Sequence, residues 1–298
     1  MLEIKKYAAI DIGSNAIRLL ISNVIVEEDK EPQFKKSSLV RVPIRLGADA
    51  FVSGTISSDN IDRMIDAMKA FNLLMKVHGV EKYKACATSA MREASNGESI
   101  VTSIKDQTGI EVDVIDGKKE AAIIFSTDLS ELIESDQSYL YVDVGGGSTE
   151  FTIFSKGRII NSKSFKMGTV RLINNKKSEN KVVFKEVQNW IETNTKNIKK
   201  ISLIGSGGNI NKIFKMSGRT IGKPISYIYL NAQYQFLKQM SYKDRISELS
   251  LNPDRADVII PATKIYLSAM KWSGARKVFV PKIGLSDGII KSLYFDKL

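Results

Sequence analysis

Aspartate and glycine recur together at two places in the 298-residue chain, each time between two apolar runs that we predict to be β-strands. Asp11 precedes Gly13 in the sequence AIDIGSNAIRLL, and Asp143 precedes Gly145 in YVDVGGGSTEF. A glycine turn presents several backbone N–H groups without side chains in the way, and such concavities bind phosphate and other anions. Carboxylates beside it would repel phosphate, so we expect a divalent cation, Mg²⁺, between them.

A third glycine cluster, in the sequence IGSGGN, carries Gly207 and Gly208 between a predicted strand and a predicted helix. The N-terminus of a helix adds its own N–H groups and positive dipole to an anion site. Three loops of this kind imply a phosphorylated or polyphosphate substrate. The chain contains neither the dinucleotide pattern GxGxxG nor the Walker pattern GxxxxGK followed by Ser or Thr, which excludes two common phosphate-binding folds.

Few residues are available for other kinds of catalysis. The one cysteine, Cys86, lies in the sequence YKACATSA, and the one histidine, His78, lies at the end of a predicted helix. A single thiol cannot form an internal disulfide or a zinc site, so we interpret Cys86 as a core residue. The positive charge of a histidine is favoured at a helix C-terminus. Acid–base chemistry therefore falls to carboxylates or lysines.

The formal net charge of +11 is concentrated in one part of the chain. Residues 156–223 contain 13 lysines and 3 arginines against 3 glutamates. Such a segment favours a polyanionic partner, and a solvated lysine-rich surface is the alternative. Few aromatic residues interleave with these charges, which argues against single-stranded nucleic acid stacked on aromatic rings.

Around these loops the sequence predicts an α/β protein in which one pattern occurs twice. A strand, a glycine turn and a strand open the chain, and helices and strands then alternate, beginning with a helix over residues 61–75. The strand–turn–strand pattern returns at residues 140–154. We place the boundary near residues 122–138 and expect two domains, 1–122 and 123–298, facing each other across a central cleft. A helix near 286–298 is a candidate for packing back on the first domain.

The sequence contains no apolar run long enough to predict a membrane-spanning helix. The N-terminal stretch MLEIKKYAAIDIGS has too short an apolar part, and too acidic an end, for a signal peptide. We therefore expect a cytoplasmic protein without a membrane partner.

Five segments in this order, AAIDIGSNAIRLLI, ATSAMREASNG, DVGGGSTEF, MGTVRL and IGSGGN, resemble the exopolyphosphatase/guanosine pentaphosphate phosphohydrolase family. This family belongs to the superfamily of acetate kinase, Hsp70 and actin, and the resemblance covers essentially the whole chain. It implies two actin-like, ribonuclease H-like domains in the short two-domain form. It also implies Mg²⁺-dependent removal of terminal phosphate from inorganic polyphosphate or guanosine pentaphosphate, and it is compatible with a homodimer.

The resemblance assigns roles to individual residues. The implied phosphate-binding residues are Gly13, Ser14, Asn15, Arg18, Arg92, Gly145, Gly146, Gly147, Ser148, Gly207 and Gly208. The implied metal-site residues are Asp11, Asp143 and Glu150, and Glu150 also orients the attacking water. A second family glutamate lies in a pattern like S-G-x-E-E-A, which reads DGKKEAA here, with Lys119 at the first glutamate position. We assign the remaining Glu120 as the general base, although such a glutamate is ordinarily a surface residue favoured by the helix dipole.

The mechanism that follows is in-line attack of water on a terminal phosphoryl group, with the rate supplied by positioning and charge stabilisation. Three other interpretations stay open. The substrate could be guanosine pentaphosphate, the chain could be an actin-like sugar or acetate kinase, or it could be a basic polyanion-binding module without catalysis.

Overall fold

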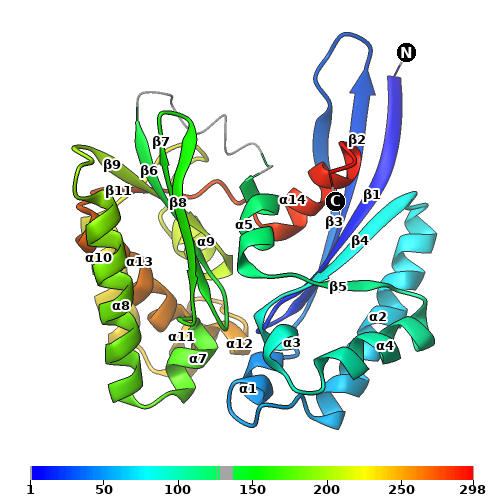
Figure 1. Ribbon diagram of the computed structural model, residues 1–298, viewed down its shortest axis with the longest axis horizontal. Coiled ribbons are helices and arrows are strands. Elements are labelled where there is room, and N and C mark those ends of the chain that lie inside the picture. Colours follow the sequence, from blue (N-terminus) through cyan, green and yellow to red (C-terminus); the bar gives the residue numbers. More distant parts are fainter. Residues whose placement is uncertain (1, 126, 128–136, 298) are drawn as a thin grey trace. The chain divides into compact units, whose positions relative to one another are not determined.

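The computed structural model describes residues 2–125, 127 and 137–297 (Figure 1). The chain forms two compact units. Unit 1 comprises residues 1–127 and 284–298, and unit 2 comprises residues 128–283. The predicted boundary region, 122–138, includes residues 126 and 128–136, which lie outside the described part of the chain. Each unit has its own sheet and its own apolar core.

The sheet of unit 1 has the strand order β3-β2-β1-β4-β5. Its strands are β1 (Leu2–Ile12), β2 (Ile17–Glu27), β3 (Gln33–Val42), β4 (Lys82–Ala87) and β5 (Val112–Val114). The first three form an antiparallel meander, and β4 and β5 run parallel to β1. The predicted strand–turn–strand at the start of the chain and the interpretation of Cys86 as a core residue are thereby confirmed. Parallel strands bring their carboxyl ends to one edge of the sheet, which is where ligands bind in α/β proteins.

The helices of unit 1 are α1 (Leu46–Ala50), α2 (Ser58–His78), α3 (Ser89–Glu93), α4 (Gly97–Thr108) and α5 (Gly117–Phe125). The apolar stripe of α2 packs on the sheet, with Met64, Met68 and Phe71 fully buried. Gly79 ends this helix in the left-handed conformation, with φ 67°, and His78 occupies the last turn as predicted.

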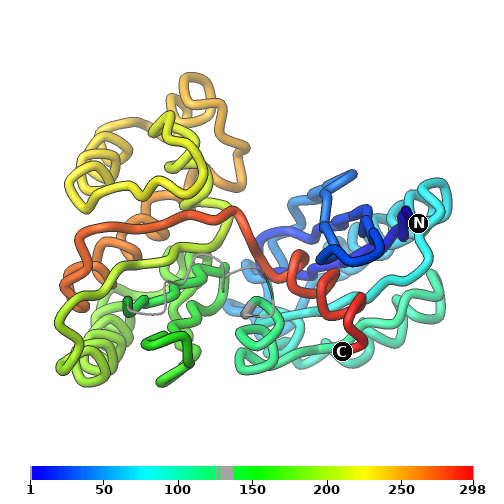
Figure 2. The backbone as a smooth tube through the Cα atoms, turned by 90° about the horizontal axis from the view of Figure 1, so that it is seen from above, coloured from blue at the N-terminus to red at the C-terminus, as the bar shows by residue number. Residues whose placement is uncertain are grey.

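A helix from the far end of the sequence completes unit 1. The helix α14 (Leu285–Tyr294) packs against β1, β2, β4 and α5, so that segments distant in sequence lie side by side (Figure 2). Gly288 allows the approach, because a Cβ atom there would stand 2.2 Å from the carbonyl oxygen of Ile123. The carboxylate of Asp287 accepts a hydrogen bond from Gly284 N–H (3.0 Å) and pairs with Lys36 of β3 (2.7 Å).

Unit 2 repeats the topology of unit 1. Its strands are β6 (Ser138–Val144), β7 (Thr149–Ser155), β8 (Arg158–Phe165), β9 (Ile201–Ser206), β10 (Ile225–Ser226) and β11 (Lys277–Phe279). The order β10-β11-β9-β6-β7-β8 contains the order of unit 1 read in the opposite direction, with β10 added at one edge. The predicted repetition of one α/β pattern is therefore confirmed.

The helices of unit 2 are α7 (Thr169–Asn174), α8 (Lys177–Thr195), α9 (Gly208–Met216), α10 (Tyr227–Gln239), α11 (Tyr242–Ser247), α12 (Pro253–Ala256) and α13 (Ile259–Ser273). The central helix of this group is α13, which contacts α8, α9 and α10 and also β6 and β9 (Figure 1). Among the described residues, no helix has both the length and the apolar character needed to cross a bilayer.

Cys86 is predicted to be unreactive in the folded protein. Its side chain is fully buried, and burial, with the Asp113 carboxylate as the next cause, raises its pKa from 9.0 to about 12. Because the thiolate is the reactive form, we expect labelling at pH 8 to be about a thousandfold slower in native than in denatured protein. A disulfide-exchange reagent followed by absorbance measures both rates. Rapid stoichiometric labelling of the native protein would contradict the described burial.

Candidate active site

The two glycine hairpins place their acidic residues at equivalent positions. In unit 1, Asp11 of β1 lies directly opposite Arg18 of β2. In unit 2, Asp143 of β6 lies directly opposite Glu150 of β7. Directly opposed residues in an antiparallel pair project from the same face of the sheet, with Cβ atoms about 5 Å apart. Unit 1 therefore holds an acid–base pair beside its turn, and unit 2 holds a pair of carboxylates.

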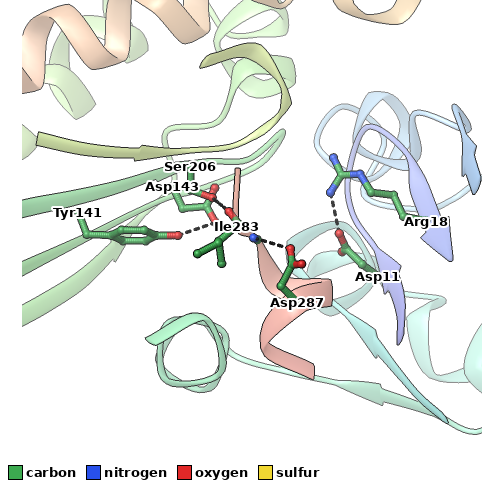
Figure 3. A network of polar contacts seen from close by, with 8 residues as sticks. Asp11, Arg18, Tyr141, Asp143, Ser206, Ile283 and Asp287 are labelled. Atoms are coloured by element: carbon green, nitrogen blue, oxygen red, sulfur yellow. Dashed lines mark hydrogen bonds and ion pairs between the residues drawn. The ribbon is translucent and has the colours of Figure 1, made fainter. Parts of the chain in front are cut away.

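The pair in unit 1 is an ion pair. Arg18 Nη1 lies 2.7 Å from Asp11 Oδ2, and Figure 3 shows the guanidinium directed at the carboxylate. The Asp11 side chain is 7% exposed and that of Arg18 is 36% exposed. Arg18, predicted to neutralise phosphate, thus neutralises Asp11 in this structure. Its exposed part remains available to an anion.

The turn of unit 1 is fixed by contacts with segments distant in sequence. Gly13 N–H donates to the carbonyl of Ala16 (3.2 Å). The carbonyl of Ser14 accepts from Gly47 N–H (2.8 Å), and the hydroxyls of Ser14 and Ser89 lie 2.9 Å apart. Asn15, in the same turn, accepts from the backbone N–H of residue 45 through its carbonyl (3.1 Å). These bonds hold the turn in one conformation before any ligand binds.

The turn of unit 2 has the same local geometry. Gly145 N–H donates to the carbonyl of Ser148 (3.0 Å), as Gly13 does to Ala16. A Cβ atom added at Gly145 would stand 3.1 Å from the carbonyl oxygen of Ser148, and one added at Gly13 would stand 3.2 Å from that of Ala16. Both positions therefore tolerate only glycine without a shift of the turn.

The segment that follows β8 is hydrogen-bonded to the second turn. The carbonyls of Gly145 and Gly146 accept from Thr169 N–H (3.0 Å) and Val170 N–H (2.9 Å). Arg171 Nε donates to the carbonyl of Gly147 (3.0 Å). Three carbonyls of the turn are thus bonded to this segment and Gly145 N–H is bonded to Ser148, so the turn is held in one conformation.

Gly168 lies so close to this turn that alanine should not fit. A Cβ there would stand 2.2 Å from the carbonyl carbon of Gly146 and 2.3 Å from Gly147 N. We expect Gly168→Ala to destabilise the protein by about 3 kcal/mol or more, because backbone atoms must move. The melting temperature should fall by roughly 6–12 °C in a thermal-unfolding experiment.

Gly284→Ala is the matched control for this substitution. Gly284 is extended, with φ −151°, and an added Cβ there has no neighbour within 4 Å. Its melting temperature should equal that of the parent protein. Equal melting temperatures for the Gly168 variant and the parent would contradict the described approach of the two segments.

Glu150 is buried and its orientation is fixed. Its side chain is among the buried charged groups at 3% exposure. The hydroxyls of Ser148 and Ser164 donate to Oε1 over 2.7 and 2.9 Å. Two donors on one oxygen hold the carboxylate in one orientation. Ser164, on β8, is a supporting residue that we did not predict from the sequence.

Asp143 lies beside two buried tyrosines. The hydroxyl of Tyr141 lies 3.5 Å from Asp143 Oδ2 and points toward it in Figure 3. Tyr266 of α13 donates a short hydrogen bond to the carbonyl of Ser206, the residue paired with Asp143 across β6 and β9. Burial, followed by the charge of Asp143, raises the pKa of both tyrosines well above the ordinary value. Both phenols are therefore neutral at physiological pH.

The third glycine cluster forms the entry to α9. Gly207 has φ 116°, a conformation that favours glycine, and an added Cβ would approach Asp143 Oδ1 to 3.6 Å. The guanidinium of Arg255 lies 3.1 Å from the Cβ position of Gly208. Burial, and then the charges of Lys215 and Arg255, lowers the pKa of Lys212. Arg255 thus places a positive charge at the N-terminus of the helix, and Lys212 and Lys215 lie further along it.

Arg255 is a candidate functional residue that sequence reasoning missed. It lies far from every glycine cluster in the sequence, in NPDRADVI, and only the folding of α12 against α13 brings it to α9. A basic residue at a helix N-terminus opposes the dipole unless an anion lies between them.

Glu120 and Arg92 lie around one loop of unit 1. Arg92 Nη1 donates to the carbonyl of Ile115 (2.5 Å), and Glu120 N–H donates to the carbonyl of Asp116 (2.9 Å). Asp116 Oδ1 accepts from Lys119 N–H (2.7 Å), which caps the helix α5. Glu120 is half-buried in the first turn of that helix.

The side chain of Lys119 turns toward β5. Its ammonium lies 3.9 Å from Asp113, whose carboxylate is also 2.6 Å from the ammonium of Lys84. The positive charge at the position where the family pattern has its first glutamate is therefore partly neutralised within unit 1.

Within each unit the predicted residues gather at the carboxyl edge of the sheet. In unit 1 the ends of β1, β4 and β5 are linked, because Thr88 N–H donates to Ile12 (3.1 Å) and Ile115 N–H donates to Ala87 (2.9 Å). In unit 2 the ends of β6 and β9 are paired at Asp143 and Ser206. Among the described residues, no three His, Cys, Asp or Glu side chains cluster as a complete metal site.

Comparisons with known proteins agree with these observations. The family model described as the Ppx/GppA phosphatase family matches residues 24–295. A bifunctional 3-dehydroquinate synthase/phosphatase of Fusobacterium nucleatum is 29% identical over 92% of this chain and 44% of its own length. Exopolyphosphatase 2 of Mycobacterium tuberculosis is 24% identical over 97% of this chain and 98% of its own length.

A solved structure has the same fold over almost the whole chain. The crystal structure of an exopolyphosphatase from Cytophaga hutchinsonii superposes with a TM-score of 0.86 and 25% identity, covering 98% of both chains. The predicted α/β fold of two actin-like domains is thereby confirmed. Together with the match to residues 24–295, these similarities show that the chain belongs to the Ppx/GppA phosphatase family.

Proposed function

We propose that the protein is an exopolyphosphatase, which releases terminal orthophosphate from inorganic polyphosphate by Mg²⁺-assisted attack of water. The observation that carries the proposal is the pair of carboxylates, Asp143 and Glu150, set opposite each other beside the Gly145 turn. An anion-binding turn beside two carboxylates suits a phosphorylated substrate that arrives with a divalent cation. Membership in a phosphatase family supports the same reaction.

The residues present fit Mg²⁺. This ion usually keeps several waters and binds through one or two carboxylates together with substrate phosphates, rather than in a complete protein cage. Asp143 and Glu150 supply oxygen ligands from one face of one sheet, and we propose Asp11 as a further metal-site residue. When bound, Mg²⁺ would neutralise the charge on the phosphoryl oxygens.

The remaining roles are assigned to residues at the carboxyl edges of the two sheets. We propose that Glu120 takes the proton from the attacking water and that Glu150 orients that water. The backbone N–H groups of the turns, with Ser14, Ser148 and Arg92, would hold the reacting phosphoryl group in line. The full proposed phosphate-binding set is Gly13, Ser14, Asn15, Arg18, Arg92, Gly145, Gly146, Gly147, Ser148, Gly207 and Gly208.

Guanosine pentaphosphate is the second candidate substrate, because a guanosine-5'-triphosphate,3'-diphosphate pyrophosphatase of Photobacterium profundum is 31% identical over 49% of this chain and 28% of its own length. The basic segment 156–223 favours the longer polyanion. We also propose that the protein acts in the cytoplasm and forms a homodimer, as the sequence and its family resemblance lead us to expect.

A phosphate-release assay tests the proposal. Long polyphosphate, tripolyphosphate and guanosine pentaphosphate are supplied at equal phosphoryl concentration, with Mg²⁺ or with a chelator. We expect the highest kcat/KM on long polyphosphate and loss of activity with the chelator. Release from guanosine pentaphosphate alone would favour the second candidate. Release from none of the three would reject the enzymatic proposal.

A further inference from the structure

A stripe of three lysines runs along one face of α8 in unit 2. Lys177, Lys181 and Lys185 follow one another at intervals of four residues, which places them on one side of a helix. All three side chains are exposed. The stripe extends over about 12 Å of helix, at about 1.5 Å per residue. We call these three residues the α8 lysine stripe.

The α8 lysine stripe has no carboxylate counterpart within the described part of the chain. No ion pair joins any of its three ammonium groups to an acid among those residues. No acidic residue stands three or four positions from any of them in the sequence, so each neighbour of Lys181 along the stripe is another lysine. Like charges at this spacing repel one another.

The acidic residues of α8 are engaged elsewhere. Glu179 accepts a hydrogen bond from Lys176 N–H (3.3 Å) at the start of the helix. Glu186 pairs with Lys163 of β8 (3.2 Å), and Glu192 accepts from Gln188 (2.7 Å). The three glutamates of α8 therefore interact with groups outside the stripe. Repulsion that the fold leaves unrelieved points to an anionic ligand outside the chain.

The N-terminal part of α8 is linked to the glycine turn of the candidate active site through α7. Arg171, in α7, donates to the carbonyl of Gly147 in that turn (3.0 Å). Asn180, in the first turn of α8, donates to the carbonyl of Leu172 in α7 (2.9 Å). Basic side chains therefore follow one another from Arg171, which is bonded to the turn, to the lysines of α8.

The neighbouring helix extends the positive surface. The ammonium of Lys264, on α13, lies 4.8 Å above the ring of Phe184 of α8, and the ring of Trp272 packs edge-on against Phe184 at 6.0 Å. The two rings are used within the protein and do not form a row of exposed stacking surfaces. Point charges without such surfaces suit a phosphate chain better than single-stranded nucleic acid.

We propose that the α8 lysine stripe binds the distal phosphoryl groups of a polyphosphate chain whose terminal group lies at the Gly145–Gly147 turn. The proposal rests on the proposed function and adds to it a source of chain-length preference. Each internal phosphoryl group carries a negative charge, so a longer substrate reaches more of the stripe. Tripolyphosphate occupies the turn and leaves most of the stripe unused.

The experiment compares two triple substitutions in the full chain. The test variant is Lys177→Gln with Lys181→Gln and Lys185→Gln. The matched control is Lys196→Gln with Lys199→Gln and Lys200→Gln, which removes the same charge at the opposite end of α8, where the side chains are also exposed. For the test variant we expect KM on long polyphosphate to rise about tenfold at low salt, with kcat and the tripolyphosphate kinetics unchanged.

Salt dependence and stability give two further readouts. If about 0.7 counterions are released per contact, as with single-stranded nucleic acids, the slope of log affinity against log salt should become shallower by about two in the test variant alone. The melting temperature of the test variant should not fall, because the substitution removes repulsion. A lower melting temperature would mean that the lysines serve folding, and it would overturn the proposal.

Direct binding separates failure of this proposal from failure of the proposed function. Fluorescence anisotropy of end-labelled polyphosphate needs no turnover, so it reports on the stripe even if no substrate is hydrolysed. Weaker binding by the test variant, with unchanged binding by the control, supports the stripe. Equal losses in both variants, an equal loss on tripolyphosphate, or tighter binding of single-stranded DNA than of polyphosphate of equal charge would each overturn it.

Discussion

Glu150→Gln is expected to lower kcat for phosphate release by about 10²–10⁴-fold, the range for loss of a positioned acid–base or electrostatic group. The substitution keeps the shape of the side chain and removes the charge that would hold Mg²⁺ and water. The amide also offers a poor partner to Ser148 and Ser164, which both donate to Oε1. Initial rates against Mg²⁺ concentration should show a higher requirement for the metal.

Two serine variants separate the role of Glu150 from the stability of its hairpin. Ser164→Ala removes a donor to Glu150 Oε1, and Ser162→Ala removes the hydroxyl contact with Thr152 (2.8 Å) two pairs further along the same strands. We expect the first to lower kcat severalfold and the second to leave it unchanged. Equal effects of the two variants, or full activity of Glu150→Gln, would contradict the assigned role.

Glu120→Gln is expected to lower kcat by a similar factor, about 10²–10⁴, because we assign this carboxylate as the base that receives the proton of water. The pH dependence should change with it: the acidic limb of the kcat profile, which reports ionisation of the base, should flatten in the variant. KM for long polyphosphate should change little, since the α8 lysine stripe and the glycine turns are intact.

The control for Glu120 is a glutamate in the first turn of another helix of unit 1. Glu98 lies exposed in the first turn of α4, as Glu120 lies in the first turn of α5. The helix dipole favours a negative charge at both positions. Glu98→Gln therefore measures the loss of that contribution to stability alone, about 0.3–1 kcal/mol. If the two variants retained equal activity, Glu120 would be a surface residue of the ordinary kind and the base would have to be sought elsewhere.

Much of the fold followed from local patterns in the sequence. The glycine turns, the alternation of apolar runs and the apolar stripe of α2 each specify an element within a few residues, and all were confirmed. Strand β5 is short, Val112–Val114, and the residues on either side of it lie in loops. The assigned catalytic and binding roles remain predictions that the variants above test.

The features that could not be predicted all depend on segments far apart in the sequence. Nothing local to Gly168 indicates that its backbone will lie against Gly146, and nothing local to Arg255 indicates a position beside Gly208. A turn can be recognised from its residues, whereas its supporting contacts become visible only once the chain has folded.

The position of α14 has a consequence for biosynthesis. Because α14 covers β1, β2 and β4 and meets α5 at Gly288, the ribosome must synthesise all of unit 2 before unit 1 can bury that face. During translation the nascent first unit would therefore expose apolar surface for the time needed to add about 150 residues, which at about 5–20 residues per second is roughly 8–30 seconds. Such an interval is long enough for a chaperone to bind the growing polypeptide.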